Sequence, residues 1–312
     1  MLMKKLIALG LLLIGLLTVI AGCGKTDSTA SQATRTVTYE GTQYTIPAKP
    51  ERIAVLSNSI LQMLDAVGGT SVSRVESSDV LSDKLQKLPS LGHTASINME
   101  QLLALKPDLV LGLSNQHAKF ESQLQSNKLP YILITYDGIK DNVPLIEFLG
   151  DIVGQPDKAK AVIAQYNDGI AAAKAKLTNV TPARVAVLRA TGKAVTAETE
   201  KSITASMVKE LGMDNVVLNH KELADSTAKT VPYSLETLAV DDPDVIFIVT
   251  MGKKEDITKT MEKEMTGNPA WNNLKAVKNG KVFYLPSNLF LLNPGLHTPD
   301  AMNELIKDAY NL

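Results

Sequence analysis

Two short segments of the chain have nearly the same sequence: Arg52-Ile-Ala-Val-Leu56 and Arg184-Val-Ala-Val-Leu188. Each is a short apolar run, rich in β-branched residues, that follows a proline, which is typical of a buried strand. A segment of helical character follows each run, over residues 60–69 and 202–212, and both segments end at a glycine. The sequence therefore predicts the same strand–helix unit twice in one chain.

A second pair of segments matches without gaps. Glu100-Gln-Leu-Leu-Ala-Leu-Lys-Pro107-Asp108 and the run to Leu113 align with Glu236-Thr-Leu-Ala-Val-Asp-Asp-Pro243-Asp244 and the run to Val249. In each, a short helix begins near the glutamate, ends before Pro-Asp and leads into an apolar strand. Such units are common in α/β proteins, so coincidence is the alternative, but two pairs in the same order favour a repeat. Strands that alternate with helices predict parallel sheets in two doubly wound, Rossmann-like α/β lobes.

A long amphipathic helix is predicted between the two halves. From Asp157 onward, apolar residues recur at steps of three and four, at Ala159, Val162, Ile163, Tyr166, Ile170, Ala173 and Leu177. About 20 residues at a rise of 1.5 Å span about 30 Å, which is enough to join one lobe to the other. We therefore expect a first lobe over residues 37–156, a connecting helix over 157–180 and a second lobe over 181–312, with little hinge bending.

The N-terminus has the features of an export signal. Two lysines precede an uncharged, mostly apolar run from Leu6 to Gly24, which indicates a secretory signal. Because the run is nearly long enough to cross a bilayer, an uncleaved anchor is the alternative. Ile20-Ala-Gly-Cys23 resembles the lipobox of bacterial lipoproteins, and Cys23 is the only cysteine in the chain. We expect a signal peptide over 1–22, lipidation of Cys23, a flexible tether over 23–36 and an extracytoplasmic, membrane-anchored protein.

Composition excludes a nucleic-acid-binding function. The formal net charge of the chain is −1, and aromatic residues make up only 4% of it. Such a chain has neither the basic field that phosphates require nor the aromatic surface on which single-stranded bases stack.

The chain resembles a known family, the substrate-binding proteins of ABC importers for iron complexes, haem and cobalamin. The resemblance covers about residues 36–312 and rests on four motifs in order. These are Pro50 to Ser57, Leu91-Gly92 followed by Ile97-Asn-Met-Glu100, Leu105-Lys-Pro-Asp-Leu-Val110, and Leu274-Lys-Ala-Val-Lys-Asn-Gly-Lys-Val-Phe-Tyr284. It implies a class III periplasmic binding protein: two lobes joined by one long helix, a monomer without enzymatic activity, and a partner ABC permease dimer with its ATPase.

Topology indicates where a ligand would bind. In open parallel sheets, ligands lie beyond the carboxyl ends of the strands. The candidates there are Asn58, Ser59, Ser114, Asn115 and His117 in the first lobe and Arg189, Thr191 and Met251 in the second. Three more candidates are His93 and Thr94, in a loop that faces the cleft in the family, and Phe290, after a late strand. For each polar residue, simple solvation of a loop is the alternative.

The ligand expected first is haem, carried as cargo and not as a permanent cofactor. Haem iron accepts His or Met as axial ligands. In haem-binding members of the family, a Met follows the Leu-Gly motif and a His follows the Pro-Asp strand of the second lobe. Ala95 and Met251 occupy those places here, with His93 nearby, so His93 and Met251 are the predicted iron ligands. Arg189 could pair with a carboxylate such as a propionate, and an ordinary surface or salt-bridged arginine is the alternative. For Met251, packing in the core is the alternative to binding iron. For the ligand, the alternatives to haem are a ferric siderophore, a cobalamin or another chelate.

Two other classes of function compete. A zinc or manganese binder needs three or four converging His and carboxylate ligands, whereas the four histidines here are scattered. A hydrolase on a two-lobed α/β scaffold would need a catalytic motif, and the chain has no Gly-x-Ser-x-Gly elbow, phosphate-binding glycine loop or His-x-x-x-His pair.

The repeat also places one acidic residue at an equivalent position in each half. Glu100 and Glu236 begin matching helices, where a carboxylate stabilises the helix N-terminus by about 0.3–1 kcal/mol. Related cobalamin and iron-complex binders carry a glutamate at each matching place, and both form salt bridges to permease arginines. The resemblance therefore implies that Glu100 and Glu236 dock the protein on its permease.

Overall fold

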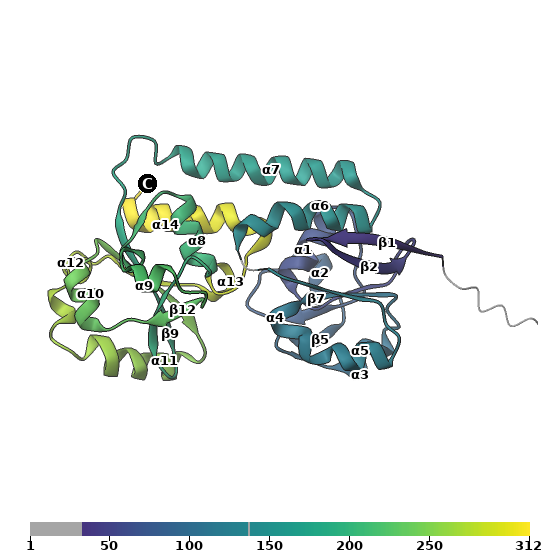
Figure 1. Cartoon of the computed structure of the whole chain (residues 1–312), viewed down its shortest axis with the longest axis horizontal. Coiled ribbons are helices and arrows are strands. Elements are labelled where there is room, and N and C mark those ends of the chain that lie inside the picture. The colour runs from purple at the N-terminus through teal and green to yellow at the C-terminus, as the bar shows by residue number, and fades with distance from the viewer. Residues whose placement is uncertain (1–32, 137) are drawn as a thin grey trace, which may run out of the picture. The chain divides into compact units, whose positions relative to one another are not determined.

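The computed structural model describes residues 33–136 and 138–312, and Ala33–Leu312 form one unit by their contacts. The predicted signal peptide, Cys23 and most of the predicted tether lie outside the described residues. Figure 1 shows the arrangement of the helices and strands. The chain alternates strands and helices through two lobes, which confirms the predicted α/β class.

The first lobe runs from β1 to α6. Its elements are β1 (Thr34–Tyr39), β2 (Thr42–Pro47), β3 (Ile53–Val55), α1 (Asn58–Ala66), β4 (Arg74–Glu76), α2 (Asp83–Gln86), β5 (Ser90–His93), β6 (Ser96–Ile97), α3 (Met99–Ala104), β7 (Leu109–Leu113), α4 (Ser114–His117), α5 (Glu121–Ser126), β8 (Tyr131–Ile134) and α6 (Asn142–Ile152).

The sheet of the first lobe is covered on both faces. Strands β3, β7 and β8 pair in parallel in that order, and β4, β5 and β6 form a second sheet that adjoins β3 through a bridge between Ile53 and Ser71. Successive residues of β7 alternate between two cores, since Leu109 packs with α1 and α6 whereas Val110 packs with α3 and α5. A strand buried on both faces reads as a continuous apolar run, as β7 does.

The second lobe runs from β9 to α14. Its elements are β9 (Arg184–Thr191), β10 (Val195–Glu198), α8 (Ile203–Glu210), β11 (Asp214–Asn215), α9 (Lys221–Ala224), β12 (Thr230–Pro232), α10 (Leu235–Asp241), β13 (Val245–Met251), α11 (Lys254–Met261), a π-helical turn (Glu262–Thr266), α12 (Lys275–Lys278), β14 (Val282–Leu285), α13 (Ser287–Phe290) and α14 (Thr298–Tyr310).

The sheet of the second lobe is mixed. Its order is β12-β10-β9-β13-β14, with β11 paired to the start of β9. Strands β9, β11, β13 and β14 are parallel, whereas β10 and β12 are antiparallel to their neighbours. Val187 and Phe247 face a core shared with α8 and α14, and Leu188 and Ile248 face a second core shared with α10 and α11. The two lobes therefore repeat one sandwich of helix, sheet and helix.

The sequence repeat has a physical basis in the structure. In the first lobe the guanidinium of Arg52 donates to the carbonyl oxygen of Leu105 at the end of α3, while Asp108 accepts from the backbone N–H of Arg52. In the second lobe Arg184 donates to the carbonyl oxygen of Asp241 at the end of α10, and Asp244 accepts from the N–H of Arg184. The shared pattern of arginine, helix and Pro-Asp thus ties the end of each helix to the start of the first central strand.

The long helix α7 (Pro156–Ala175) lies across α6 and α14 (Figure 1). Its apolar stripe divides between the lobes: Ala159, Val162 and Ile163 pack on the first core, and Ile170, Ala173 and Leu177 on the second. The helix ends at Ala175, before the predicted boundary at residue 180. The last turn tightens through bonds such as Thr178 N–H to the carbonyl oxygen of Ala175, and Asn179 is left-handed. Within residues 33–136 and 138–312, no helix combines the length and apolarity needed to span a bilayer.

A buried polar cluster joins the lobes beneath α7. The amide nitrogen of Asn142 donates to the hydroxyl of Tyr166 on α7 at 2.7 Å and to that of Thr298 on α14 at 3.0 Å. Its amide oxygen accepts a hydrogen bond from the hydroxyl of Tyr136, just past β8. One side chain at the start of α6 therefore connects the first lobe to the last helix of the second.

The hairpin β1–β2 differs from the predicted tether over residues 34–36, because β1 begins at Thr34. Val37 and Tyr39 point into the first core, and Arg35 donates to the carbonyl oxygen of Asp151 at 2.7 Å. The turn at Glu40-Gly41 has positive φ at both residues, as a tight two-residue hairpin requires. The alternation of apolar and polar residues after Ala33 thus extends the ordered chain into the predicted tether.

Candidate ligand-binding cleft

Two adjoining cavities lie between the lobes. The outer one has a volume of about 330 Å³, and the inner one is a narrow extension of about 40 Å³. Both are lined from the first lobe by Thr94 and Asn115 and from the second lobe by Ile203, Lys229 and the Leu291–Leu292 pair. The shared lining makes them one cleft, and the carboxyl ends of β3, β7 and β9 contribute Ser57, Asn115 and Arg189 to its walls.

The wall from the first lobe is largely uncharged and polar. Ser57, Asn58 and Ser59 line it where β3 passes into α1. The Asn58 amide is already bound to the backbone of Val75, donating to the carbonyl oxygen at 2.9 Å and accepting from the N–H at 3.2 Å. Asn115 is exposed and lines both cavities. On this wall Asn115 is therefore exposed at the cavities, whereas the Asn58 amide is held by the backbone of Val75.

The wall from the second lobe is built around a buried ion pair. Arg189, near the end of β9, lines the outer cavity, and its Nε and Nη2 lie 2.8 Å and 2.6 Å from one oxygen of Glu198 on β10. The Glu198 side chain is fully buried, and its other carboxylate oxygen has no hydrogen-bond partner among the described residues. Burial raises the pKa of Glu198, and the charge of Arg189 opposes that rise.

Two predicted histidines lie away from the cavities. His117 is fully buried; its Nε2 is 2.8 Å from the carbonyl oxygen of Thr94, and its Nδ1 accepts from the N–H of Leu113 at 2.8 Å. His93 is exposed, with its Nε2 3.8 Å from the Glu76 carboxylate. Neither lines the cleft, although Thr94 between them does.

Three other predicted residues also lie outside the cavity lining. The hydroxyl of Ser114 lies 3.3 Å from that of Thr135, and the hydroxyl of Thr191 donates to the carbonyl oxygen of Ala194. Phe290 is fully buried in the second core. Of the predicted site residues, the structure brings together at the cleft Asn58, Ser59, Thr94, Asn115, Arg189 and Met251.

Sequence reasoning missed several polar residues of the cleft, among them Asp79, Tyr136, Lys229 and Asn293. Tyr136 follows β8, so the expectation that ligands lie beyond the carboxyl ends of strands could have identified it. The other three follow no central strand. Burial raises the pKa of Asp79, which the hydroxyl of Ser77 opposes by donating a hydrogen bond at 2.7 Å.

The described residues contain no group of three or more His, Cys, Asp or Glu side chains that could hold a metal ion. Met251, half exposed, lines the outer cavity, and it is the predicted iron ligand that the structure places there.

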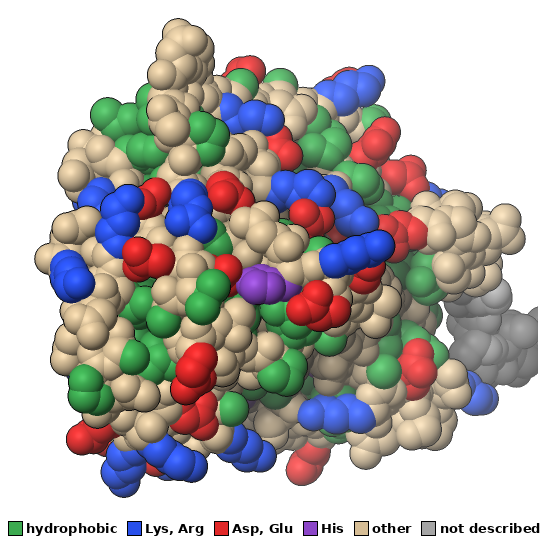
Figure 2. Space-filling view, turned by 60° about the vertical axis from the view of Figure 1, so that its left-hand side comes forward, with side chains coloured by type: hydrophobic (Ala, Val, Ile, Leu, Met, Phe, Trp, Pro, Cys, Tyr) green, Lys and Arg blue, Asp and Glu red, His purple; other side chains and the backbone are tan. Residues whose placement is uncertain are grey.

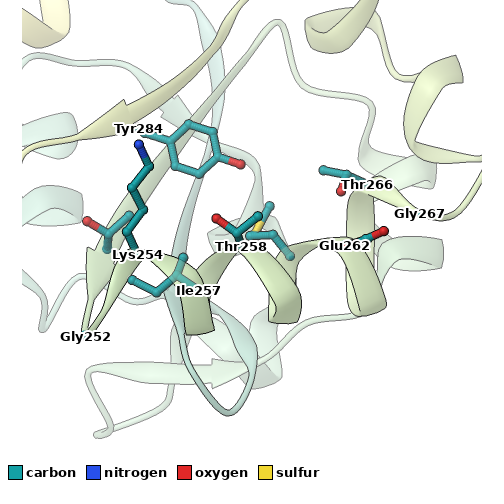
Figure 3. Close-up of a pocket in the computed structure, with 10 residues that line it drawn as sticks. Gly252, Lys254, Ile257, Thr258, Glu262, Thr266, Gly267 and Tyr284 are labelled. Atoms are coloured by element: carbon teal, nitrogen blue, oxygen red, sulfur yellow. The ribbon is translucent and has the colours of Figure 1, made fainter.

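A larger cavity, of about 720 Å³, lies wholly within the second lobe (Figure 3). Lys254, Thr258 and Glu262 line it from α11 and the π-helical turn, and Tyr284 of β14 lies opposite. It shares no lining residue with the two cleft cavities and receives none from the first lobe. We therefore place the candidate site in the cleft, where both lobes contribute.

Glu100 and Glu236 lie at equivalent places in the two lobes. Each is the second residue of its helix, α3 or α10, and each helix is capped two residues earlier, by Asn98 or Ser234. Both glutamates are exposed. Hydrogen bonds from its own backbone N–H and from the Ser234 hydroxyl lower the pKa of Glu236. Val240, one turn later on α10, is 84% exposed, which is unusual for an apolar side chain.

Charges of both signs are interspersed over the face shown in Figure 2, without a broad area of either sign. This distribution agrees with the net charge of −1. The face offers no extended basic surface to nucleic acid.

Comparison with known proteins identifies relatives of the whole chain. The model of the periplasmic binding protein family matches residues 53–289. The probable siderophore-binding lipoprotein YfiY of Bacillus subtilis is 30% identical, and the alignment covers 98% of this chain and 97% of YfiY. The Fe(3+)-citrate-binding protein YfmC of the same organism is 26% identical, over 99% and 98% of the two chains. The crystal structure of Staphylococcus aureus IsdE complexed with heme superposes with a TM-score of 0.71, at 23% identity, over 83% of this chain and 98% of IsdE.

Proposed function

This chain belongs to the periplasmic binding protein family, and from that premise we propose that it binds a ferric complex between its lobes and delivers it to an ABC permease. The observation that carries the proposal is the cleft, whose polar lining comes from both lobes. Relatives named as binders of siderophores and of ferric citrate support this class of ligand. We propose no catalytic step.

Within that class we propose a ferric siderophore or a similar chelate ahead of haem. The sequence placed haem first, with His93 and Met251 as iron ligands. The comparisons do not favour haem over the other iron complexes, and the cavities are lined by Met251 but by neither His93 nor His117. A chelate that already fills the coordination sphere of iron needs hydrogen bonds from the protein and no axial ligand, which suits the polar lining. Haem is the second candidate, because Met251 lines the cleft and methionine can be an axial ligand of haem iron.

Full-length protein, purified in detergent from its native host, tests the ligand class by its absorption spectrum. A broad visible charge-transfer band would support a ferric siderophore, whereas a sharp Soret band would replace it by haem. Titration of the apoprotein with ferric siderophores and with haemin then gives the affinities. Binding of neither would contradict the proposed function.

Asn115→Ala supplies a variant of the cleft itself. Loss of one hydrogen bond to the ligand, worth about 1 kcal/mol, should weaken binding about fivefold. Ser114→Ala is the matched control, because Ser114 adjoins Asn115 but does not line the cavities. Equal affinity in the Asn115 variant and the wild type would remove Asn115 from the site.

We also propose that Cys23 carries a lipid that anchors the protein outside the cytoplasm. The motif before Cys23 and relatives named as lipoproteins support this. Multiple acyl chains hold firmly because each buried CH₂ contributes about 0.8 kcal/mol. Cys23→Ser should leave an unprocessed precursor without radiolabelled fatty acid. Wild-type protein that incorporates no fatty acid would contradict the anchor.

Docking on the permease is proposed at Glu100 and Glu236. Their equivalent positions in the repeat, their exposure and the exposed Val240 beside Glu236 support this role. A pair of like sites suits a permease built of two like subunits, since each lobe then meets one of them.

A further inference from the structure

The buried pair of Arg189 and Glu198 sets the charge of the cleft. The Arg189 side chain is 15% exposed and lines the outer cavity, while Glu198 is fully buried behind it. Both contacts from the guanidinium, through Nε and Nη2, go to the same carboxylate oxygen. A guanidinium carries five N–H donors in a fixed planar fork. The contact with Glu198 therefore holds the orientation of that fork and leaves the Nη1 side to other acceptors.

The charged side chains that line the two cavities are few. They are Asp79, Arg189 and Lys229 among the described residues. Together with Glu198 behind Arg189, these described side chains carry two positive and two negative charges. The remaining lining is made of hydroxyl, amide and apolar side chains, such as Thr94, Asn115 and Ile203.

We infer that the cleft selects ferric chelates of small net charge, and that Glu198 sets this selectivity by neutralising Arg189 while holding its guanidinium at the cleft wall. The inference rests on the proposed function and narrows its ligand class. A chelate with several negative charges gains little attraction from a balanced cleft and loses its hydration on entering. A neutral chelate, such as one built from hydroxamates, loses less hydration and still offers oxygens to the fixed donors of Arg189.

Glu198 is a positioning residue, because it acts on the ligand through Arg189. Its removal has two separable consequences. The guanidinium loses its fixed orientation, which weakens binding of every chelate, and the cleft gains one net positive charge, which favours anionic chelates alone. If Glu198 had a merely structural role, its removal would weaken binding of every chelate equally. The ratio of the affinities for an anionic and a neutral chelate therefore isolates the effect of the added charge.

The test uses full-length protein in detergent and two hexadentate ferric chelates, neutral ferrichrome and triply anionic ferric enterobactin. Dissociation constants are measured by isothermal titration at fixed pH and ionic strength. Wild-type protein should bind ferrichrome more tightly. In Glu198→Gln the ratio of the two affinities should shift toward ferric enterobactin by about tenfold, as expected for one added charge opposite three at partly screened distances.

Two further variants are controls. Arg189→Gln combined with Glu198→Gln removes both charges and should restore the wild-type ratio. Glu200→Gln makes the same change of charge on an exposed residue that pairs with Lys209 and does not line the cleft, so its ratio should equal that of the wild type.

Tighter binding of ferric enterobactin by the wild type would overturn the inference, even if Glu198→Gln failed to fold. So would a Glu198→Gln variant that weakens both chelates equally. In both cases the proposed function would survive. Failure of the wild type to bind any ferric chelate would instead overturn the proposed function and the inference with it.

Discussion

His117 and Thr94 are joined by a hydrogen bond of 2.8 Å between the imidazole Nε2 and the carbonyl oxygen of Thr94. The N–H of Leu113 donates to the opposite ring nitrogen, Nδ1, which must therefore be unprotonated. The proton of the neutral ring then resides on Nε2 and is donated to Thr94. The histidine thus fixes the loop that carries Thr94 to the cleft, from behind the cleft wall.

We expect this histidine to make stability depend on pH. Burial lowers the pKa of His117, and its two backbone hydrogen bonds oppose the shift. In the unfolded chain a histidine titrates near 6.5, so between the folded and unfolded pKa values the unfolded state binds more protons. The stabilisation is present above about pH 6.5 and is lost as the pH falls toward the folded pKa. Urea unfolding at a series of pH values measures this.

His117→Gln is the comparison for that series. The amide does not titrate, so the fall in unfolding free energy below about pH 6.5 should become shallower. Imperfect geometry should also leave a backbone group of Leu113 or Thr94 unpaired, at a cost of about 1–3 kcal/mol at neutral pH. An unchanged slope in the variant would assign the pH dependence to other groups.

The packing of α6 on α7 depends on a glycine. A Cβ atom added at Gly150 would collide with the Cβ of Ala159, whereas its next neighbour, the carbonyl oxygen of Gln155, is 3.3 Å away. We expect Gly150→Ala to lower the unfolding free energy by about 1–3 kcal/mol, although alanine favours a helix by about 1 kcal/mol over glycine. Denaturant unfolding measures the difference.

The exchange variant Gly150→Ala with Ala159→Gly is the control for this prediction. It moves the methyl group from one helix to the other and should recover stability lost in Gly150→Ala, less the cost of a glycine in α7. If the double variant loses as much unfolding free energy as the two single variants lose together, the close approach of the helices is not the cause of the loss in Gly150→Ala.

The polar cluster at Asn142 should be a large contributor to stability. Asn142→Ala removes one hydrogen-bond partner from each of the Tyr136, Tyr166 and Thr298 hydroxyls, and the Thr298 hydroxyl keeps a second bond, to the carbonyl oxygen of Gly295. We expect a loss of about 2–4 kcal/mol, because buried hydroxyls without partners are costly. Thr298→Val removes one hydroxyl of the cluster and should cost less. If Asn142→Ala lowered the unfolding free energy less than Thr298→Val does, the central position of Asn142 in the cluster would be contradicted.

Ligand binding should change the distance between the lobes little. Helix α7 packs on both cores, and the Asn142 cluster ties α6 to α7 and α14. Small-angle scattering with and without a bound ferric chelate should therefore give nearly equal radii of gyration, unlike the hinge closure of proteins with flexible connections. A decrease of several ångströms would contradict a rigid connection.

Glu100→Ala and Glu236→Ala should separate transport from binding. Both side chains are exposed and outside the cleft, so ligand affinity and melting temperature should change little while uptake by cells falls, most in the double variant. Glu121→Ala is a control, since it also removes a glutamate from the first turn of a helix, α5. Full uptake by the double variant would exclude docking.

The architecture of this protein could be predicted from the order of its amino acids. Strand β7 appears as an unbroken apolar run and α7 as a stripe with helical spacing, because burial imposes these periods on neighbouring residues. The pairing of Arg52 with Asp108, and of Arg184 with Asp244, repeats the same local connection, so the repeat is visible in the order of the amino acids alone. The expectation that ligands lie beyond the carboxyl ends of parallel strands also predicted Asn115 and Arg189, which line the cleft.

The side chains that the cleft presents to a ligand could not be predicted in this way, because they depend on contacts between distant segments of the folded chain. His93 ends β5 and His117 ends α4, both next to the residues of the cleft. The His93 ring, however, lies beside the Glu76 carboxylate, and the His117 ring is hydrogen-bonded to the backbone of Thr94 and Leu113. The charge of Arg189 is balanced by Glu198, which sits on the neighbouring antiparallel strand, and Lys229 arrives from a segment that follows no central strand. Periodicity records whether a residue is buried, but the direction and charge of a binding side chain depend on partners that only the folded chain brings beside it.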